Sequence, residues 1–140
     1  MQVAKPKKGY KLVKTSFGKY EEIPEEWELT DLEAIFSIKQ GKYFDEQLTS
    51  KGRYPVYGAN GIISHTDKIM YKERVVLVSC RGANCGVVHL TQKSSWVNNN
   101  SMALVPKNKK FDLEFFYFLL QSTYLLHRNI FHNLHQLQKV

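Results

Sequence analysis

Two short turns of the same composition constrain this chain more than any other feature. They lie in Tyr54–Ile63, which reads Tyr-Pro-Val-Tyr-Gly-Ala-Asn-Gly-Ile-Ile, and in Arg81–Val88, which reads Arg-Gly-Ala-Asn-Cys-Gly-Val-Val. In both segments Gly-Ala-Asn lies beside residues that favour strands. Glycine adopts positive φ angles, and asparagine tolerates such turns while offering two donors and an acceptor. Both segments are therefore predicted to be tight turns that present hydrogen-bonding groups from a rigid sheet.

The residues around these turns predict a mostly antiparallel sheet. Val75–Val78 is a continuous apolar run, which is typical of a strand buried on both faces. Val87–Leu90 can return beside it across the second turn, so a hairpin is expected. Trp96–Val97 and Met102–Val105 add further short strands, the last of which is stopped by a proline.

Helices are predicted at both ends of this sheet region. Thr30 or Asp31 can cap a short helix that runs to Phe36. Asp112 is a candidate N-cap for Leu113–Leu126, which is apolar nearly all round and is therefore expected to pack on several sides.

Two further expectations concern the ends of the chain. Trp27 and Leu29 alternate with charged residues, which predicts a short strand with a buried tryptophan. Near the C-terminus, Ile130, Leu134 and Leu137 keep a helical spacing.

The distribution of charge divides the chain into regions. Residues 1–20 hold six lysines and no acid, residues 21–33 hold seven acids and no base, and residues 34–140 hold 14 Lys/Arg against 6 Asp/Glu. A length of 140 residues with 43% hydrophobic residues suits one folded domain. We expect a basic lead-in at 1–22 and a single domain at 23–140, whose basic body attracts polyanions.

Several function classes find little support in the sequence. Two cysteines, Cys80 and Cys85, cannot form a four-ligand zinc site alone, and His132 with His135 is weak metal evidence. There is no phosphate-binding loop or dinucleotide fingerprint, so no cofactor is expected. Neither a signal peptide nor a membrane span is visible, which predicts a cytoplasmic protein with free thiols.

Five motifs in order carry a resemblance to a known family. They are Ile23–Leu29 with its Pro-Glu-Glu-Trp, Phe36–Lys42 with its Ile-Lys-Gln-Gly-Lys, the two turn segments Tyr54–Ile63 and Arg81–Val88, and Trp96–Val97. Together they resemble a target recognition domain of the DNA-specificity (S) subunit of type I restriction–modification enzymes. The match covers most of the chain, and five motifs in the right order are far more specific than any one of them.

The resemblance implies both a fold and a function. The fold would be α/β of the α+β type, a compact, twisted, mostly antiparallel sheet with short helices and a packed C-terminal helix. The function would be sequence-specific binding of double-stranded DNA, reading one half of a bipartite target. Methylation with S-adenosylmethionine and cleavage would be done by the modification (methyltransferase) and restriction subunits, so this chain would hold no catalytic residue, cofactor or metal.

Five side chains near the turns are candidates for DNA contact because of their chemistry. Lys39 and Lys42 can neutralise phosphates, and Gln40 can pair with an adenine edge. Arg81 can hold a phosphate or bind guanine with two hydrogen bonds, unless it forms an ion pair with a neighbouring acid. Asn99, the middle one of three consecutive amides, either satisfies backbone groups or contacts DNA.

Four more candidates belong to the turns and their flanks. Asn60 and Asn84 either close their own turns through side-chain-to-backbone bonds or read base edges. Tyr57 and His65 flank the first turn and can stack or hydrogen-bond on DNA, although Tyr57 can equally belong to the core.

Other functions remain open at this stage. A single-strand-binding module would stack bases on Tyr54, Tyr57 and Trp96. A thiol enzyme would use Cys80 as nucleophile with His65 or His89 as base. A fused restriction–methyltransferase would carry the same kind of recognition domain.

The chain departs from the family's pattern in its length. A full specificity subunit resembles two such domains separated by long helices, whereas this chain has one domain with a truncated connecting helix. It is therefore expected to be a fragment, a half-subunit that pairs with itself as a homodimer, or a truncated reading frame.

Overall fold

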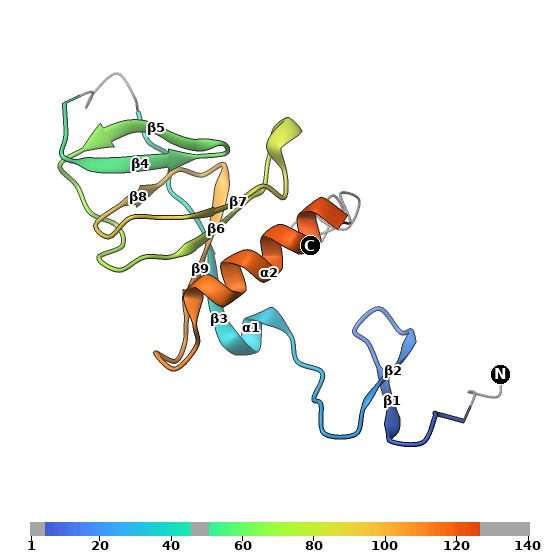
Figure 1. The fold of residues 1–140 in the computed structure, drawn as a ribbon. Helices are drawn as coiled ribbons and strands as arrows, with labels where there is room; N and C mark the ends of the chain where they lie inside the picture. Colours follow the sequence, from blue (N-terminus) through green and yellow to red (C-terminus); the bar gives the residue numbers. More distant parts are fainter. Residues whose placement is uncertain (1–4, 46–50, 127–140) are drawn as a thin grey trace. The chain divides into compact units, whose positions relative to one another are not determined.

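The computed structural model describes residues 5–45 and 51–126, which belong to two separate units (Figure 1). Unit 1 ends at Ala34 and unit 2 begins at Ile35, whereas the sequence analysis expected the lead-in to end at residue 22. The predicted helical spacing beyond residue 128 lies outside the described residues.

Unit 1 is built on a two-stranded hairpin. β1 (Tyr10–Lys14) pairs antiparallel with β2 (Tyr20–Pro24), and the connecting turn is closed by the Thr15 amide, which donates to the Lys19 carbonyl at 2.7 Å. The predicted strand around Trp27 is wrong. The strand ends at Pro24, the Trp27 amide donates back to the Pro24 carbonyl in a turn, and the Trp27 side chain is 62% exposed. A hairpin of two strands has no second layer that could bury this ring.

Unit 2 contains a four-stranded antiparallel sheet. Its order is β3 (Phe36–Gln40), β9 (Ser101–Pro106), β6 (Val76–Ser79) and β7 (Val88–Leu90). The predicted hairpin of β6 and β7 is confirmed, as is the strand β9. The predicted short helix is also present as α1 (Leu32–Ile35), and it ends one residue earlier than expected because Phe36 already pairs in β3.

A second sheet of three strands lies against the first. β4 (Tyr54–Gly58) pairs antiparallel with β5 (Gly61–Thr66) through the first Gly-Ala-Asn turn. On its other side β4 pairs in parallel with the short strand β8 (Trp96–Val97). Alternate residues of β6 explain the stacking, since Leu77 packs with Tyr57 and Val97 of the second sheet while Val76 points the other way.

The opposite face of the four-stranded sheet is covered by α2 (Leu113–Leu126). The predicted cap is confirmed, because the Asp112 carboxylate accepts hydrogen bonds from the amides of Glu114 and Phe115 at 3.0 and 3.1 Å. The core-facing residues of the helix join the buried strand residues on this side. They are Leu113, Phe116, Tyr117 and Leu120.

The expectation that this helix packs on several sides is wrong for its described side chains. Phe115 and Phe118 are 59% and 60% exposed. The helix is thus packed by one face. The α+β fold with its mostly antiparallel sheets and C-terminal helix is otherwise as expected from the sequence.

Candidate nucleic-acid interface

Four of the segments singled out in the sequence meet at one edge of unit 2. Strands β3, β4 and β6 end there, and β5, β7 and β9 begin there. We call this the turn edge and define it as Gln40–Lys42, Gly58–Gly61, Ser79–Gly86 and Asn98–Ser101. The two sheets therefore bring together motifs that are far apart in the sequence.

Two buried serines fasten the first turn to the four-stranded sheet. Ser79 and Ser101 face each other as partners in β6 and β9. The Ser101 hydroxyl donates to the Gly58 carbonyl at 3.0 Å, and the Ser79 hydroxyl donates to the Ala59 carbonyl. Gly61 completes the turn with a φ of 97°, a conformation that favours glycine. The turn is thus held by hydrogen bonds to its backbone.

The second turn is closed by its own backbone. Gly82–Asn84 form a short 3-10 helix, and the Val87 amide donates to the Asn84 carbonyl at 3.0 Å. The Gly86 amide donates to the Ser79 carbonyl at 2.7 Å, which closes the base of the loop. In the described part of the chain, neither Asn60 nor Asn84 forms a hydrogen bond through its side-chain amide. The side-chain amides of Asn60 and Asn84 are therefore not used to close the turns.

A third segment approaches the edge through Gly41. The Gly41 amide donates to the Ser101 carbonyl at 2.9 Å, and a Cβ on Gly41 would lie within 2.5 Å of the Val97 carbonyl oxygen. Only glycine permits this approach. The neighbouring Gln40 side chain donates through Nε2 to the Asn99 carbonyl at 2.8 Å, which fixes its amide plane at the edge and leaves Oε1 as an acceptor.

The three consecutive asparagines, Asn98–Asn100, differ in what their side chains do. Asn98 is buried, and its side-chain oxygen accepts a hydrogen bond from the Asn100 amide at 2.8 Å, so it supports the backbone. Asn99 is half-buried, and its carbonyl, not its side chain, receives the bond from Gln40. The expectation that amides here satisfy backbone groups thus describes Asn98, while the side chain of Asn99 remains available.

The cationic candidates at and near the turn edge are exposed. Lys39, Lys42 and Arg81 all have exposed side chains. Among the described residues Arg81 forms no ion pair, so the alternative of a neighbouring acid is not what the structure shows. Lys42 lies beside β8, where its backbone bonds to Val97.

Two of the candidates lie elsewhere. Tyr57 is only 5% exposed and its hydroxyl accepts a hydrogen bond from the Gln92 amide at 3.0 Å, so the ring belongs to the core. His65 in β5 is exposed, but it lies opposite Pro55 of β4, near the end of the hairpin that is remote from the turn edge. Burial of Tyr57 also removes one of the three aromatic platforms that single-strand binding would need.

The far end of the hairpin carries a set of cations that the sequence analysis did not single out. We call it the basic edge. Its members are Lys51, Arg53, Lys68, Lys72 and Lys93, and all five are exposed. They are scattered over more than forty residues of sequence. Only knowledge of how the strands pair could have brought them together.

The thiols have the environment of structural cysteines. Cys80 is buried, and burial raises the pKa of its thiol although the Arg81 charge acts in the opposite direction. Its sulfur donates to the Asn99 carbonyl at 3.9 Å and not to an imidazole. Burial also raises the pKa of Cys85. A thiol that stays protonated without a base is a poor nucleophile, so the enzyme alternative finds no support.

The histidines and acidic residues that the structure describes give no sign of a metal centre. His89 is half-buried, burial lowers its pKa, and its Nε2 has no hydrogen-bond partner. No cluster of three potential metal ligands occurs within residues 5–45 and 51–126. His132 and His135 lie outside the described residues.

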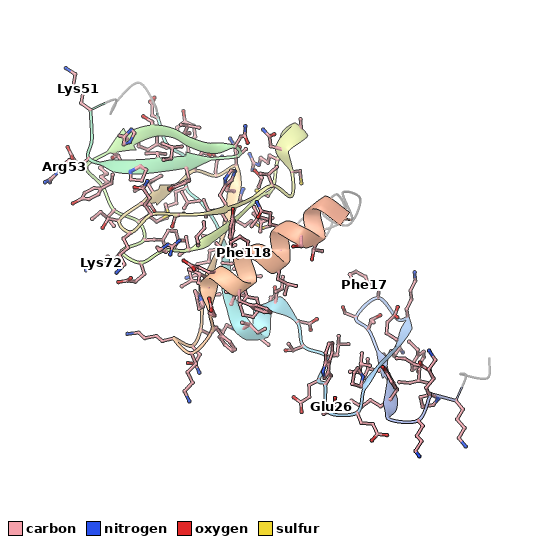
Figure 2. The ribbon with its side chains drawn as sticks, in the orientation of Figure 1. Phe17, Glu26, Lys51, Arg53, Lys72 and Phe118 are labelled. Atoms are coloured by element: carbon pink, nitrogen blue, oxygen red, sulfur yellow. The ribbon has the colours of Figure 1, made fainter. Side chains whose placement is uncertain are left out.

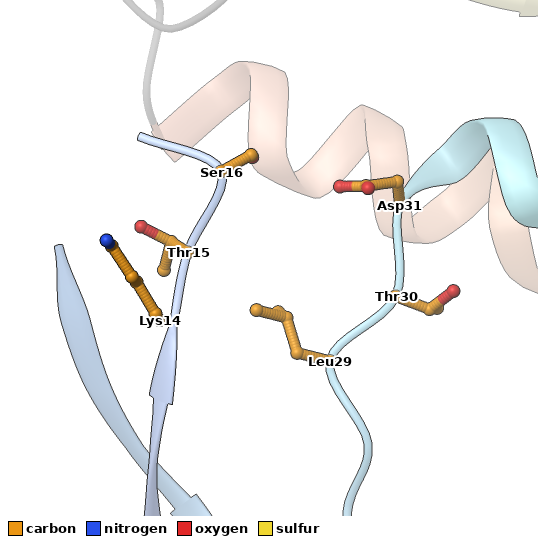
Figure 3. Close-up of a pocket in the computed structure, with 6 residues that line it drawn as sticks. All are labelled: Lys14, Thr15, Ser16, Leu29, Thr30 and Asp31. Carbon is orange, nitrogen blue, oxygen red and sulfur yellow. The ribbon is translucent and has the colours of Figure 1, made fainter. Parts of the chain in front are cut away.

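An open cavity of about 320 Å³ lies in unit 1 and is shown in Figure 3. It lies between two stretches of the unit and is lined by Lys14–Ser16 and Leu29–Asp31. The surrounding side chains are mostly exposed and offer no convergent set of polar groups for a ligand. Of the helices that the structure describes, none is long and apolar enough to cross a membrane.

An α+β domain whose sheet edge presents amide and guanidinium groups from hydrogen-bonded turns is suited to recognition of a partner. Residues 24–139 match the family described as "Type I restriction modification DNA specificity domain", and the chain belongs to this family. The resemblance drawn from the five motifs is therefore confirmed.

A solved structure supports the same assignment. The chain is similar to the crystal structure of a type I restriction–modification system S subunit from M. genitalium, with a TM-score of 0.58 and 25% sequence identity. The similarity covers 66% of this chain and 25% of that subunit, so the chain spans about a quarter of the subunit's length. Among curated proteins, none matches the chain.

Proposed function

We propose that this chain binds double-stranded DNA in a sequence-specific manner and reads one half of a bipartite target. The observation that carries the proposal is the turn edge. It offers the amides of Gln40, Asn60, Asn84 and Asn99 together with the guanidinium of Arg81. Amides and guanidinium groups are the side chains that form paired hydrogen bonds with adenine and guanine in the major groove.

The way these groups are held suits direct reading of bases. Each contact with a base edge discriminates by about 1–3 kcal/mol only when the donor and acceptor are correctly placed. At the turn edge the backbones are fixed by Ser79, Ser101 and Gly41, so the side chains start from defined positions. Fewer degrees of freedom are then lost when DNA binds.

The proposal includes a division of labour. The chain would select the target sequence without catalysing a reaction, and modification and restriction subunits would methylate or cleave the DNA. The similar S subunit and the family description support this division. The proposed site of action is the cytoplasm, because the DNA and these subunits are expected there. A homodimer is the arrangement by which two copies would read a two-part target.

Selection from a random pool of duplex DNA tests the proposal directly. The chain is used alone at 50 and 200 mM salt, and bound duplexes are sequenced. We expect enrichment of a short half-site at both salt concentrations. Binding that shows no sequence enrichment and disappears at the higher salt would mean that the chain binds DNA only through non-specific electrostatic attraction. Absence of binding would refute the proposal.

A matched pair of variants connects the result to the turn edge. Arg81→Ala should lower affinity for the enriched half-site and relax its preference at one base position. Lys109→Ala removes the same charge from an exposed position in the β9–α2 loop, and we expect it to leave the preference unchanged. Equal loss of preference in both variants would exclude Arg81 as a reading residue.

A further inference from the structure

Hydrogen bonds bring the residues of the basic edge to one end of the sheets, although they are separated in the sequence. The carboxylate of Asp67 accepts from the Arg53 amide at 3.3 Å, which joins the start of β4 to the end of β5. The Ser94 amide donates to the Lys72 carbonyl at 3.0 Å, which joins the β5–β6 loop to the β7–β8 loop. These two links hold three basic segments, at 51–53, 66–72 and 93–95, at one end of the sheets.

This edge carries a clear surplus of positive charge. Residues 51–53, 66–73 and 91–95 contain five Lys/Arg and two acids. The acids form two ion pairs, Arg53 with Asp67 and Lys93 with Glu73, each at 3.6 Å and exposed to solvent. Exposed pairs of this kind are weak, so both cations can turn to a stronger anion.

Three of the five cations have no acidic partner among the residues that the structure describes. Within the described residues, Lys51, Lys68 and Lys72 form no ion pair. Figure 2 shows Lys51, Arg53 and Lys72 pointing outward on the side where the β4–β5 hairpin opens. The guanidinium of Arg53 also lies 5.6 Å from the centre of the Tyr54 ring, which restrains its position.

The two edges differ in chemistry and lie a short distance apart. The turn edge offers amides and few charges, whereas the basic edge offers ammonium groups and few amides. They are separated by the length of β4, whose five residues span about 17 Å. One turn of duplex DNA is about 34 Å long, so both edges can contact the same turn.

We propose that the basic edge binds the phosphate backbone of the duplex whose bases are read at the turn edge. This inference rests on the proposed function and adds a second contact surface to it. Phosphate contacts supply affinity and orientation without sequence information, whereas base contacts supply the choice of sequence. The basic edge would therefore hold the duplex against the exposed strand β5 and set the register of the turn edge.

The experiment uses the salt dependence of binding, measured by fluorescence anisotropy with the full chain. The probes are the duplex enriched in the selection and an unrelated duplex of equal length. The double variant Lys51→Ala/Lys72→Ala is compared with Lys109→Ala/Lys110→Ala, which removes two exposed lysines from the β9–α2 loop. Circular dichroism melting confirms that both variants remain folded.

The two double variants should differ in the salt dependence of DNA binding and in affinity. Each phosphate contact contributes about 0.9 to the slope of log K against log salt, so two lost contacts lower the slope by about 1.8. Affinity should fall by up to about eightfold per contact at 0.1 M salt, equally for both duplexes. The control should change neither quantity, and the ratio of affinities for the two duplexes should stay constant.

Each other outcome overturns the inference in a recognisable way. An unchanged slope, or an equal fall in the control, would remove the basic edge from the interface. A changed ratio between the two duplexes would mean that these lysines read bases. These results leave the proposed function intact, whereas wild-type protein that binds no duplex at either salt refutes both.

Discussion

Replacement of Gly41 by alanine tests whether the turn edge depends on close backbone contact. The added Cβ would lie 2.5 Å from the Val97 carbonyl oxygen and closer still to that of Asn98. Both are backbone atoms, so they cannot rotate away, and β3 must separate from the segment that follows β8. This movement would strain two hydrogen bonds, from Gly41 to Ser101 and from Lys42 to Val97, each 2.9 Å long.

The magnitude follows from three contributions. Overpacking costs about 1–3 kcal/mol, and each weakened hydrogen bond costs about 0.5–1.5 kcal/mol. Reduced freedom of the unfolded chain returns about 0.4–1 kcal/mol, because alanine is less flexible than glycine. The free energy of unfolding should therefore fall by about 3 kcal/mol, which lowers the melting temperature by roughly 12–15 °C for a unit of this size.

Urea unfolding followed by circular dichroism measures this change. Gly58→Ala is the matched control, because its added Cβ would meet the Ile63 side chain, whose nearest atom lies at 2.8 Å. Ile63 is 40% exposed, so its side chain can shift where a backbone carbonyl cannot, and a smaller loss of about 1–2 kcal/mol is expected. Equal stability losses in the two variants would refute the reasoning that backbone contact at Gly41 fixes the edge.

Three other predictions concern single side chains. Ser101→Ala leaves the buried Gly58 carbonyl without its donor and should cost about 1–3 kcal/mol in urea unfolding; wild-type stability would show that this bond does not hold the turn. Trp27→Ala should change stability by less than about 1 kcal/mol because the ring is 62% exposed, and a larger loss would mean that the ring is packed. The pKa of His89 is lowered by burial below its ordinary 6.5, so the unfolded state binds the proton more readily and stability should fall as pH drops through about 6.5. Unfolding at pH 7.5 and 5.5 checks this, and His89→Gln should show a smaller difference than the wild type.

The strands of unit 2 could be predicted because their signals are local. Val75–Val78 is apolar throughout, and a strand covered by α2 on one face and by β4 and β8 on the other requires such a run. The cap at Asp112 was equally readable, since an acid before an apolar stretch can satisfy the free amides of the first helical turn.

The errors arose where a local pattern depends on distant packing. The polarity of Trp27 and its neighbours resembles that of a strand, yet Pro24 ends the pairing and no layer of unit 1 covers the ring. Leu113–Leu126 is apolar nearly all round, which indicates burial, but within residues 5–45 and 51–126 the packing partners lie on one face of the helix. The polarity pattern of a segment indicates which of its side chains favour burial. Whether another element packs over them depends on the tertiary fold.

The candidate site was partly predictable for the same reason. The Gly-Ala-Asn motif predicted both turns. The two serines that hold the first turn carry no sequence signal, because Ser79 and Ser101 meet only through the pairing of β6 with β9. Tyr57 could not be separated from the surface aromatics, since only the second sheet shows that its ring points into the core. The basic edge was missed because its lysines come from three different loops.

The closure of the second turn has a consequence for how specificity can change. The bonds that hold the loop join the Ser79 and Gly86 backbones and the Asn84 and Val87 backbones, and the side chains of Arg81 and Asn84 form none of them. Arg81 and Asn84 can be exchanged while the loop length and Gly82, with its φ of 68°, are kept. The side chains of this loop can thus be varied while its backbone is kept. A small library of variants at these two positions would test whether the preferred DNA sequence changes without redesign of the domain.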